Sequence, residues 1–302
     1  MKHSFLVGNS VNQLTASAAS WNDVMDRIRS KAKAQNLKRN GKPFSLHFEE
    51  IKNHWLRTPA NTMDSFREMV AQQMGELRHN SFHKRLTEMA VDNILTTNYD
   101  YCLEAAARSQ RQPANFHTEE TKYSLFRRII CGEKSFWHIH GELDHPGTIM
   151  LGHDHYVESC AQIRRYTTYK DGVSYKSTGA LRQRFKASKV NLRDGKPYSW
   201  VDLLMLTHLH VIGFSMDFSE TDMWYLISYK NRLQRTKRLE LARSKIHFYG
   251  FKRSGNDQIY ENIESLLESF DVECHPYEVR AGGYRSAWEK LLKDLEKNIE
   301  TR

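Results

Sequence analysis

Short apolar runs that end in small or polar residues recur along the chain and predict a β-sheet. The first run, His3 to Val7, stops at Gly8-Asn9-Ser10, a pattern typical of a buried strand that ends in a tight turn. Later segments share this pattern and are also predicted as strands: 92–97, 135–140, 203–212, 245–249 and 272–279.

Between the first two predicted strands the periodicity becomes helical. Ser20 precedes an apolar segment with Asp23 in its first turn, as at a helix N-terminus. Apolar residues then recur every three or four positions on both sides of Pro59, which separates two helices. We therefore expect a helical insertion over 16–91. Further helices are predicted over 103–108, 259–270 and 288–299.

The alternation of strands with helices defines the expected fold class. It favours an α/β fold with a Rossmann-like, mostly parallel sheet and helices on both faces. The helical insertion after the first strand adds to this plan. A length of 302 residues suits one such domain, and 11% aromatic residues provide for a real core and exclude wholesale disorder.

Several classes of protein are disfavoured by composition. No apolar run approaches the roughly 20 residues that a membrane span needs, and the first run is too short for a signal peptide. We therefore expect a cytoplasmic protein that does not act at membranes. The four cysteines stand alone, without a CxxC pair, so neither a zinc module nor a disulfide framework is indicated. Reduced thiols in or near the core are expected.

The net charge of +9 is the unusual compositional feature. Lys and Arg gather between Arg164 and Lys196, where only Asp171 and Asp194 oppose them. We interpret 157–198 as a basic excursion from the domain. Nucleic acid is one conceivable partner for it, but charge runs are more often simply solvated, and a specific nucleic-acid role is not favoured.

Polar motifs stand directly after four of the predicted strands. In open parallel sheets, ligands bind at the carboxyl ends of the strands, so these motifs are expected to converge on one edge. The motifs are Gly8-Asn9-Ser10, Thr97-Asn98-Tyr99-Asp100, His140-Gly141 and Gly213-Phe214-Ser215.

Each motif offers chemistry suited to a nucleotide. Gly8 allows a phosphate to approach the backbone, although the spaced glycines of a dinucleotide fingerprint are missing. The alternative for this motif is an ordinary turn from a strand to a helix. Asn98 can hold a water or a ribose hydroxyl, and Asp100 can accept from a carboxamide N–H. The alternative for both is an Asx turn that satisfies only backbone donors. Gly213 again leaves room for a ligand, and Ser215 can bind a ribose or phosphate.

His140 stands after a predicted strand, where an imidazole can act as a general base near neutral pH. Other histidines crowd the same region, but they form no set with the spacing of zinc ligands. No metal is therefore predicted. We interpret most of these histidines as surface or packing residues, and we interpret Phe214, Met216 and Trp224 as core residues. The neighbouring histidines are His138, His145, His153 and His155, with His208 and His210 on a later strand.

Taken in order, these motifs resemble the sirtuin superfamily, and more closely the bacterial sirtuin-like proteins of antiphage defence. The most specific piece is Ile94 to Asp100. The others are Trp137 to Leu143, Ile149-Met150-Leu151 with Tyr156, and Val211 to Met216 followed by Asp222.

The resemblance implies a role for each matching residue. Asn98 and His140 would be catalytic, Asn98 beside the nicotinamide ribose and His140 as the base. Ser10 departs from the pattern, because glycine is common at that position. The implied NAD-binding residues are Gly8, Asn9, Asn12, Asp100, Gly213 and Ser215.

The resemblance also implies an activity. Protein-deacylating sirtuins carry paired CxxC motifs, which this chain lacks, so deacylation is disfavoured. The nearer relatives suggest hydrolysis of NAD to ADP-ribose and nicotinamide, by the effector of an abortive-infection defence system. A catalytically silent sensor of NAD, ADP-ribose or another nucleotide is the alternative. Because an unregulated NAD hydrolase would harm its own cell, we expect control by homo-oligomer assembly or by a companion defence protein.

Overall fold

The computed structural model describes most of the chain. The described residues are 2–15, 20–74, 77–107, 111–114 (as a strand, without side chains), 122–168, 198–235, 244–255, 257–280 and 283–300.

An eight-stranded sheet forms the centre of the molecule, in the order β3-β4-β5-β2-β1-β6-β7-β8. From β5 to β8 every neighbouring pair is parallel, whereas β3 and β4 form antiparallel pairs at one edge. The mostly parallel sheet confirms the predicted fold class, but the two antiparallel strands were not predicted. The bounds are β1 His3–Val7, β2 Asn93–Thr96, β3 Arg111–Ala114, β4 Arg128–Cys131, β5 Lys134–His138, β6 His208–Ile212, β7 Ile246–Arg253 and β8 Glu273–Val279.

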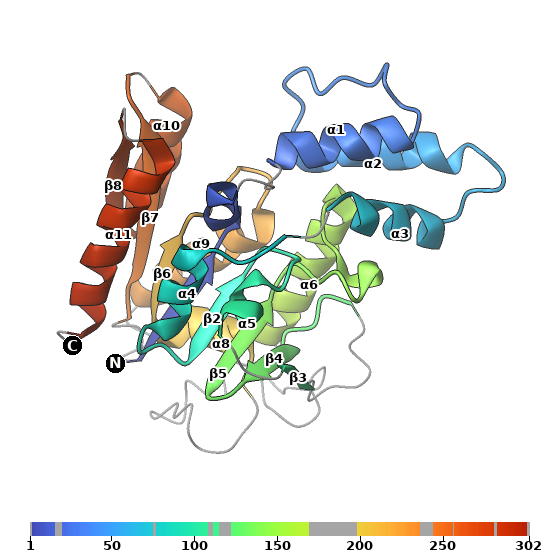
Figure 1. Ribbon diagram of the computed structural model, residues 1–302. Coiled ribbons are helices and arrows are strands. Elements are labelled where there is room, and N and C mark those ends of the chain that lie inside the picture. Colours follow the sequence, from blue (N-terminus) through green and yellow to red (C-terminus); the bar gives the residue numbers. More distant parts are fainter. Residues whose placement is uncertain are drawn as a thin grey trace.

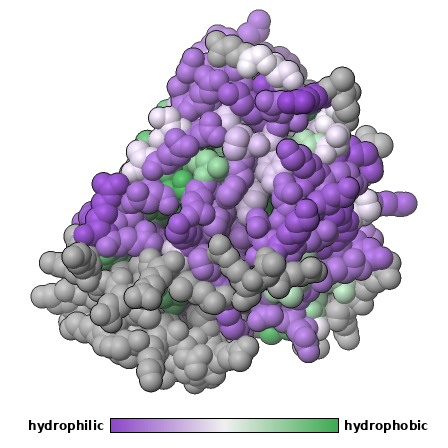
Figure 2. Space-filling model, turned by 90° about the vertical axis from the view of Figure 1, so that its left-hand side faces the viewer, coloured by the Kyte–Doolittle hydropathy of each residue, from purple (hydrophilic) through white to green (hydrophobic). Residues whose placement is uncertain are grey.

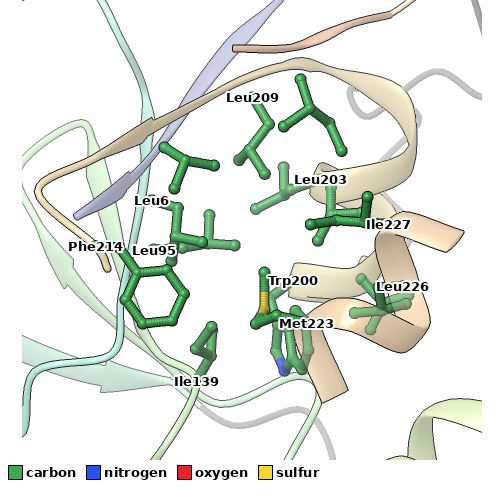
Figure 3. Close-up of a cluster of buried hydrophobic side chains, with 14 of the residues drawn as sticks. Leu6, Leu95, Ile139, Trp200, Leu203, Leu209, Phe214, Met223, Leu226 and Ile227 are labelled. Atoms are coloured by element: carbon green, nitrogen blue, oxygen red, sulfur yellow. The ribbon is translucent and has the colours of Figure 1, made fainter. Parts of the chain in front are cut away.

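Successive side chains of a strand point to opposite faces, so a strand covered on both sides has no polar face. Phe5 and Leu6 of β1 are adjacent and both fully buried. Leu6 packs with Leu95 of β2 against residues from helices on its side of the sheet, as Figure 3 shows for Trp200 and Met223. The helices that contribute to this cluster are α6 His153–Thr168, α8 Trp200–Leu206, α9 Thr221–Arg235 and α10 Gln258–Ser269.

Phe5 faces the other side, where a second set of helices covers the sheet. Trp288 of the last helix is fully buried there, next to Phe82 and Phe251. The molecule thus has three layers, with the sheet between two layers of helices (Figure 1). The helices on this side are α4 Ser81–Glu88, α5 Cys102–Ala106 and α11 Gly283–Glu300.

The helices that follow β1 include a group with a core of its own. These are α1 Trp21–Lys31, α2 Phe44–Leu56 and α3 Met63–Gln73, and Figure 1 shows them together to one side of the sheet. Side chains at Ser20 and Thr62 form capping boxes at the starts of α1 and α3. Their shared core includes Tyr99, which follows β2, so the group packs against loops at the carboxyl edge of the sheet.

The predicted strand over 203–212 is wrong in its first half. Residues up to Leu206 belong to helix α8, and only His208–Ile212 form β6. Ser199 starts the helix with a capping box to Asp202, and Leu203 and Leu204 are fully buried. A short apolar run that is buried all round has the same pattern in a helix as in a strand, so periodicity could not separate them.

Residues 157–168 of the predicted basic excursion belong to helix α6, and 169–197 lie outside the described residues. All four cysteines are free thiols, and Cys102 and Cys131 are buried, as expected. In the described part of the chain, none of the helices combines the length and apolar character of a membrane span. The side of the molecule shown in Figure 2 is mostly hydrophilic, with small separate hydrophobic areas.

Candidate active site

Strand register brings the four polar motifs to one edge of the sheet. Val7 pairs with Thr96 on one side and with Ile212 on the other, and Thr96 pairs in turn with His138. All four residues end their strands. The loops that follow β5, β2, β1 and β6 therefore leave the sheet side by side, in that order.

Two glycines allow the central loops to touch. The Gly8 N–H donates to Ile212 O at 2.9 Å, and the Ser10 N–H donates to Gly213 O at 3.0 Å. A Cβ on Gly8 would lie 2.5 Å from the Phe214 Cα. Gly8 has an ordinary φ of -96°, so the contact with the neighbouring backbone, rather than an unusual turn, requires glycine here. Gly213 has a φ of 64°, which glycine adopts without strain.

In chain order, the first to fourth loops follow β1, β2, β5 and β6. Asn12 links the first loop to the second. It belongs to the short 3-10 helix Asn9–Leu14 and is buried. Its Nδ2 donates to Asn9 Oδ1 at 2.9 Å and to Asp100 Oδ2 at 2.8 Å. The other carboxylate oxygen of Asp100 accepts from the Cys102 N–H at 3.0 Å, at the start of α5. Asp100 therefore acts as an Asx turn and also joins the polar network.

His83 of α4 fixes the orientation of the Asn12 amide. Its Nδ1 accepts from the Asn80 N–H at 3.1 Å, so the ring proton is on Nε2, which donates to Asn12 Oδ1 at 2.9 Å. Burial lowers the pKa of His83 to about 4, and this outweighs the opposite effect of Asp100. The imidazole is therefore neutral at pH 7 and holds both nitrogen atoms in defined roles.

Asn98 lies near the start of the loop that follows β2, almost fully buried. Its backbone N–H donates to Thr96 Oγ1 at 3.0 Å, and its Nδ2 donates to Gly8 O at 3.3 Å. The side-chain Oδ1 is buried and has no hydrogen-bond partner. Since a buried carbonyl without a partner costs about 1–3 kcal/mol, this oxygen is poised to accept from a ligand.

His138 holds the backbone of Asn98. Its Nδ1 donates to the backbone carbonyl of Asn98 at 2.8 Å and its Nε2 donates to Glu104 Oε1 at 2.7 Å. Burial alone would lower the pKa of His138, but Glu104 raises it to about 9. His138 is thus an imidazolium at neutral pH, where simple packing or surface exposure was predicted.

His140 follows β5 and lies between two carboxylates. Its Nε2 is 3.1 Å from Asp222 Oδ2, and its Nδ1 is 3.7 Å from Glu220 Oε2. Asp222 is fully buried in the first turn of α9, where its Oδ1 also accepts from the Met223 N–H. The Tyr156 ring lies edge-on to the imidazole, with centroids 5.5 Å apart.

The two carboxylates decide the protonation of this group. Burial disfavours the imidazolium, but Asp222 and then Glu220 outweigh it, so the pKa of His140 is raised. Burial also raises the pKa of Glu220 to about 7, against the opposing effect of His140. A proton can therefore be exchanged near neutral pH between this group and a bound molecule.

Three buried polar atoms without a hydrogen-bond partner occur in these loops. They are Ser10 Oγ, Asn98 Oδ1 and Glu220 Oε2, among the residues that the structure describes. They come from the segments after β1 and β2 and from the approach to α9. Polar atoms of this kind suit a polar ligand. The nitrogen and oxygen atoms of His140, Glu220 and Asp222 also lie close enough together to hold a metal ion.

The structure joins most of the predicted site residues, and their roles remain predictions. Asn9, Asn12 and Asp100 share hydrogen bonds, and Asn98 binds the carbonyl of Gly8. Ser215 differs, because it is exposed and no hydrogen bond ties it to the others within the described residues. The sequence reasoning gave no role to His83, Glu104, Glu220 or Asp222.

A family model for the SIR2-like domain matches residues 92–194. The match supports a sirtuin-like domain and an activity related to NAD, which SIR2-like domains use as substrate. It contains Asn98, Asp100 and His140, whereas Gly8, Asn12, Gly213 and Asp222 come from outside it. No curated protein matches this chain.

The contact between the first and fourth loops predicts that Gly8→Ala is destabilising. The new methyl group would meet the Phe214 backbone, which cannot move as a flexible side chain can. We expect the free energy of unfolding to fall by about 1–3 kcal/mol, as for other overpacked sites. Urea denaturation measures it.

Gly147→Ala is the matched control, since nothing lies within 4 Å of the position that its Cβ would take. It should change stability by no more than about 0.5 kcal/mol. Equal effects of the two substitutions would contradict the close contact at Gly8.

The His138–Glu104 pair predicts a pH-dependent contribution to stability. Because the pKa of His138 rises from 6.5 to about 9 on folding, its contribution is complete below pH 6.5 and is lost as the pH rises to about 9. The free energy of unfolding of the wild type exceeds that of Glu104→Gln at low pH, and this difference should fall by about 3 kcal/mol between pH 6.5 and about 9. Denaturation at several pH values measures it.

Glu133→Gln removes an exposed carboxylate from the turn between β4 and β5 and is the control. Its stability difference from the wild type should stay constant with pH. A Glu104→Gln difference that is equally constant would show that His138 is not protonated through this pair.

Proposed function

We propose that this protein hydrolyses NAD at the bond between nicotinamide and ribose. The observation that carries the proposal is the buried Asn98 Oδ1, which has no hydrogen-bond partner. The side-chain amide of Asn98 donates to the Gly8 carbonyl after β1, and the strand before Asn98 is paired with β5, which His140 follows. An oxygen acceptor and a titratable imidazole are groups that such a reaction needs. The SIR2-like match over 92–194 supports NAD as the substrate.

The dinucleotide would be held mainly by the first and fourth loops. Gly8 and Gly213 let the backbones of these two loops touch, and the Ser10 hydroxyl beside them is a buried group without a partner. Asp100 keeps one oxygen close to Asn12 and would accept from the nicotinamide carboxamide. Ser215 is exposed and would contact the adenosine side only at the rim.

Hydrolysis breaks the C–N bond, and its electron pair neutralises the pyridinium nitrogen of the departing nicotinamide. Water attacks the ribose carbon, which carries oxocarbenium character, and loses a proton as ADP-ribose forms. Asn98 Oδ1 would orient that water or a ribose hydroxyl. Orientation of a weak nucleophile in a closed site lowers the barrier by several kcal/mol.

His140 would accept the proton at Nδ1. Its Nε2 is hydrogen-bonded to Asp222, which fixes the tautomer and stabilises the imidazolium that forms. Glu220 is the nearest carboxylate to Nδ1 and, with a pKa of about 7, can pass the proton on to solvent. Asp222 is thus a positioning residue, and His140 is the base.

The same site could instead bind a nucleotide without turnover, as a sensor. The His140–Asp222 pair favours catalysis, because ligand recognition alone does not require a base that another side chain orients. Deacylation stays disfavoured, since the chain has no CxxC pair. We also propose a role as the effector of abortive infection in the cytoplasm. Assembly of copies, or a companion protein that contacts the helices α1 to α3, would control it.

The first prediction from this function is NAD consumption by the purified protein. Nicotinamide and ADP-ribose should appear in equal amounts, with activity that rises steeply with protein concentration if assembly is the switch. Asn98→Ala and His140→Ala should each lower turnover by about 100-fold or more, because each removes a positioned group. Separation of the products by chromatography measures this.

His145→Gln is the control, since this histidine lies in the same region but is exposed. It should retain full activity. Wild-type turnover that survives Asn98→Ala would remove Asn98 from the mechanism. A wild type that binds NAD but does not consume it at any concentration would favour the sensor.

A second prediction concerns the pH dependence of kcat/KM. The rate should rise with pH to a plateau, with a midpoint above the ordinary pKa of 6.5, because His140 must lose its proton to act as a base. In Asp222→Asn the partner that raises this pKa is gone, so the midpoint should move to lower pH. The plateau should fall as well, because the tautomer is no longer fixed. An unchanged midpoint would sink the assignment of His140 as the base.

A further inference from the structure

A group of imidazoles lies on one face of the sheet, near the amino ends of the strands. Register places them beside one another: His3 pairs with His208, and His210 pairs with His247. The rings of His210 and His247 are stacked at 4.9 Å between centroids, with planes 11° apart. The members are His3 on β1, His208 and His210 on β6, His247 on β7 and His275 on β8.

Two of these rings and one carboxylate converge. His247 Nδ1 lies 3.4 Å from His275 Nε2 and 3.1 Å from Glu273 Oε2. Zinc binds imidazole nitrogen at about 2.0–2.1 Å in tetrahedral geometry, which places two ligand atoms about 3.3 Å apart. The distances from His247 Nδ1 to the other two ligand atoms are close to this separation between ligands.

We propose that His247 Nδ1, His275 Nε2 and Glu273 Oε2 bind a divalent transition-metal ion of the zinc type. Two imidazoles and one carboxylate are an established ligand set for zinc with a fourth position open to water. All potential ligand atoms of this group lie within 4.8 Å of one another. This site is independent of the proposed NAD chemistry.

The sheet holds these ligands in place before any ion binds. His247 is the register partner of Glu273, and His275 lies two residues further along β8, on the same face. His210 stacks on the His247 ring, and Tyr249 stacks on the His275 ring at 4.9 Å. Ligands with preset rings lose little freedom on binding.

Lys245 does not compete for the ligand oxygen. It contacts Glu273 Oε1, whereas Oε2 faces His247. An ion at Oε2 can therefore bind without breaking the contact with the lysine. On the other side, Asp294 of α11 adds negative charge near His275.

The place of the site in the fold indicates what the ion would do. It joins β7 to the edge strand β8 at the amino ends of the strands, whereas the candidate active site lies at the carboxyl ends. A metal that binds only the folded chain stabilises it through mass action. The proposed ion therefore ties down an edge strand, while its fourth position stays open to water.

Calorimetric titration of the full, metal-stripped chain with Zn²⁺ tests the proposal. The wild type should bind one equivalent at this group, and His275→Gln and Glu273→Gln should each lose it. We expect affinity to fall by more than the roughly 100-fold typical of second-shell changes. A circular dichroism spectrum without metal verifies that each variant is folded. If one of the two variants fails to fold, the other still tests the proposal.

Two controls make the result specific. Asp222→Asn disrupts the other group that could hold a metal among the described residues, and His145→Gln removes an exposed imidazole. Both variants should still bind the equivalent of Zn²⁺ that His275→Gln fails to bind. Co²⁺ bound at the same group should show the visible absorption of tetrahedral coordination. Absence of binding in the wild type, or binding that survives His275→Gln and Glu273→Gln, would overturn the proposal.

Discussion

The position of β1 between two parallel neighbours is the constraint on which the rest of the structure depends. Val7 pairs with Thr96 and with Ile212, so the chain must leave the sheet at Gly8 between the loops of β2 and β6. The backbones there are too close for a side chain. The amide of Asn98 is placed by this contact, because it donates to the Gly8 carbonyl.

Beneath these loops, buried polar residues hold the site in one arrangement. A neutral His83 orients the Asn12 amide, while a protonated His138 binds the Asn98 carbonyl. One imidazole is neutral and the other is protonated, because only His138 has a buried carboxylate hydrogen-bonded to its ring. Each side chain of the proposed chemistry is thus supported by a group that does not react, which is how a site keeps its geometry when water and substrate exchange.

Local pattern was sufficient to predict the parallel strands of the sheet and the motifs that follow them, since apolar runs and the polar residues that end them are adjacent in sequence. It failed where the pattern is ambiguous, as at Leu203, or where partners are distant. His83 is 71 residues from Asn12, and His140 is 82 residues from Asp222. Asp222 was visible only as part of a motif, and Glu220 had no signal. These contacts follow from the order of strands in space, which no local pattern contains.

Histidine serves several purposes in this molecule, and the surroundings of each imidazole decide which. Histidine is a neutral hydrogen-bonding group at position 83 and a cation at 138, and at 140 it lies between two carboxylates that keep its proton exchangeable. At the opposite edge, imidazoles face one another and Glu273, an arrangement that suits a metal better than a proton. Counting histidines along the chain cannot separate these cases, because the deciding carboxylates are brought in by other strands and helices. The chemistry at each edge is therefore set by the order of the strands in the sheet.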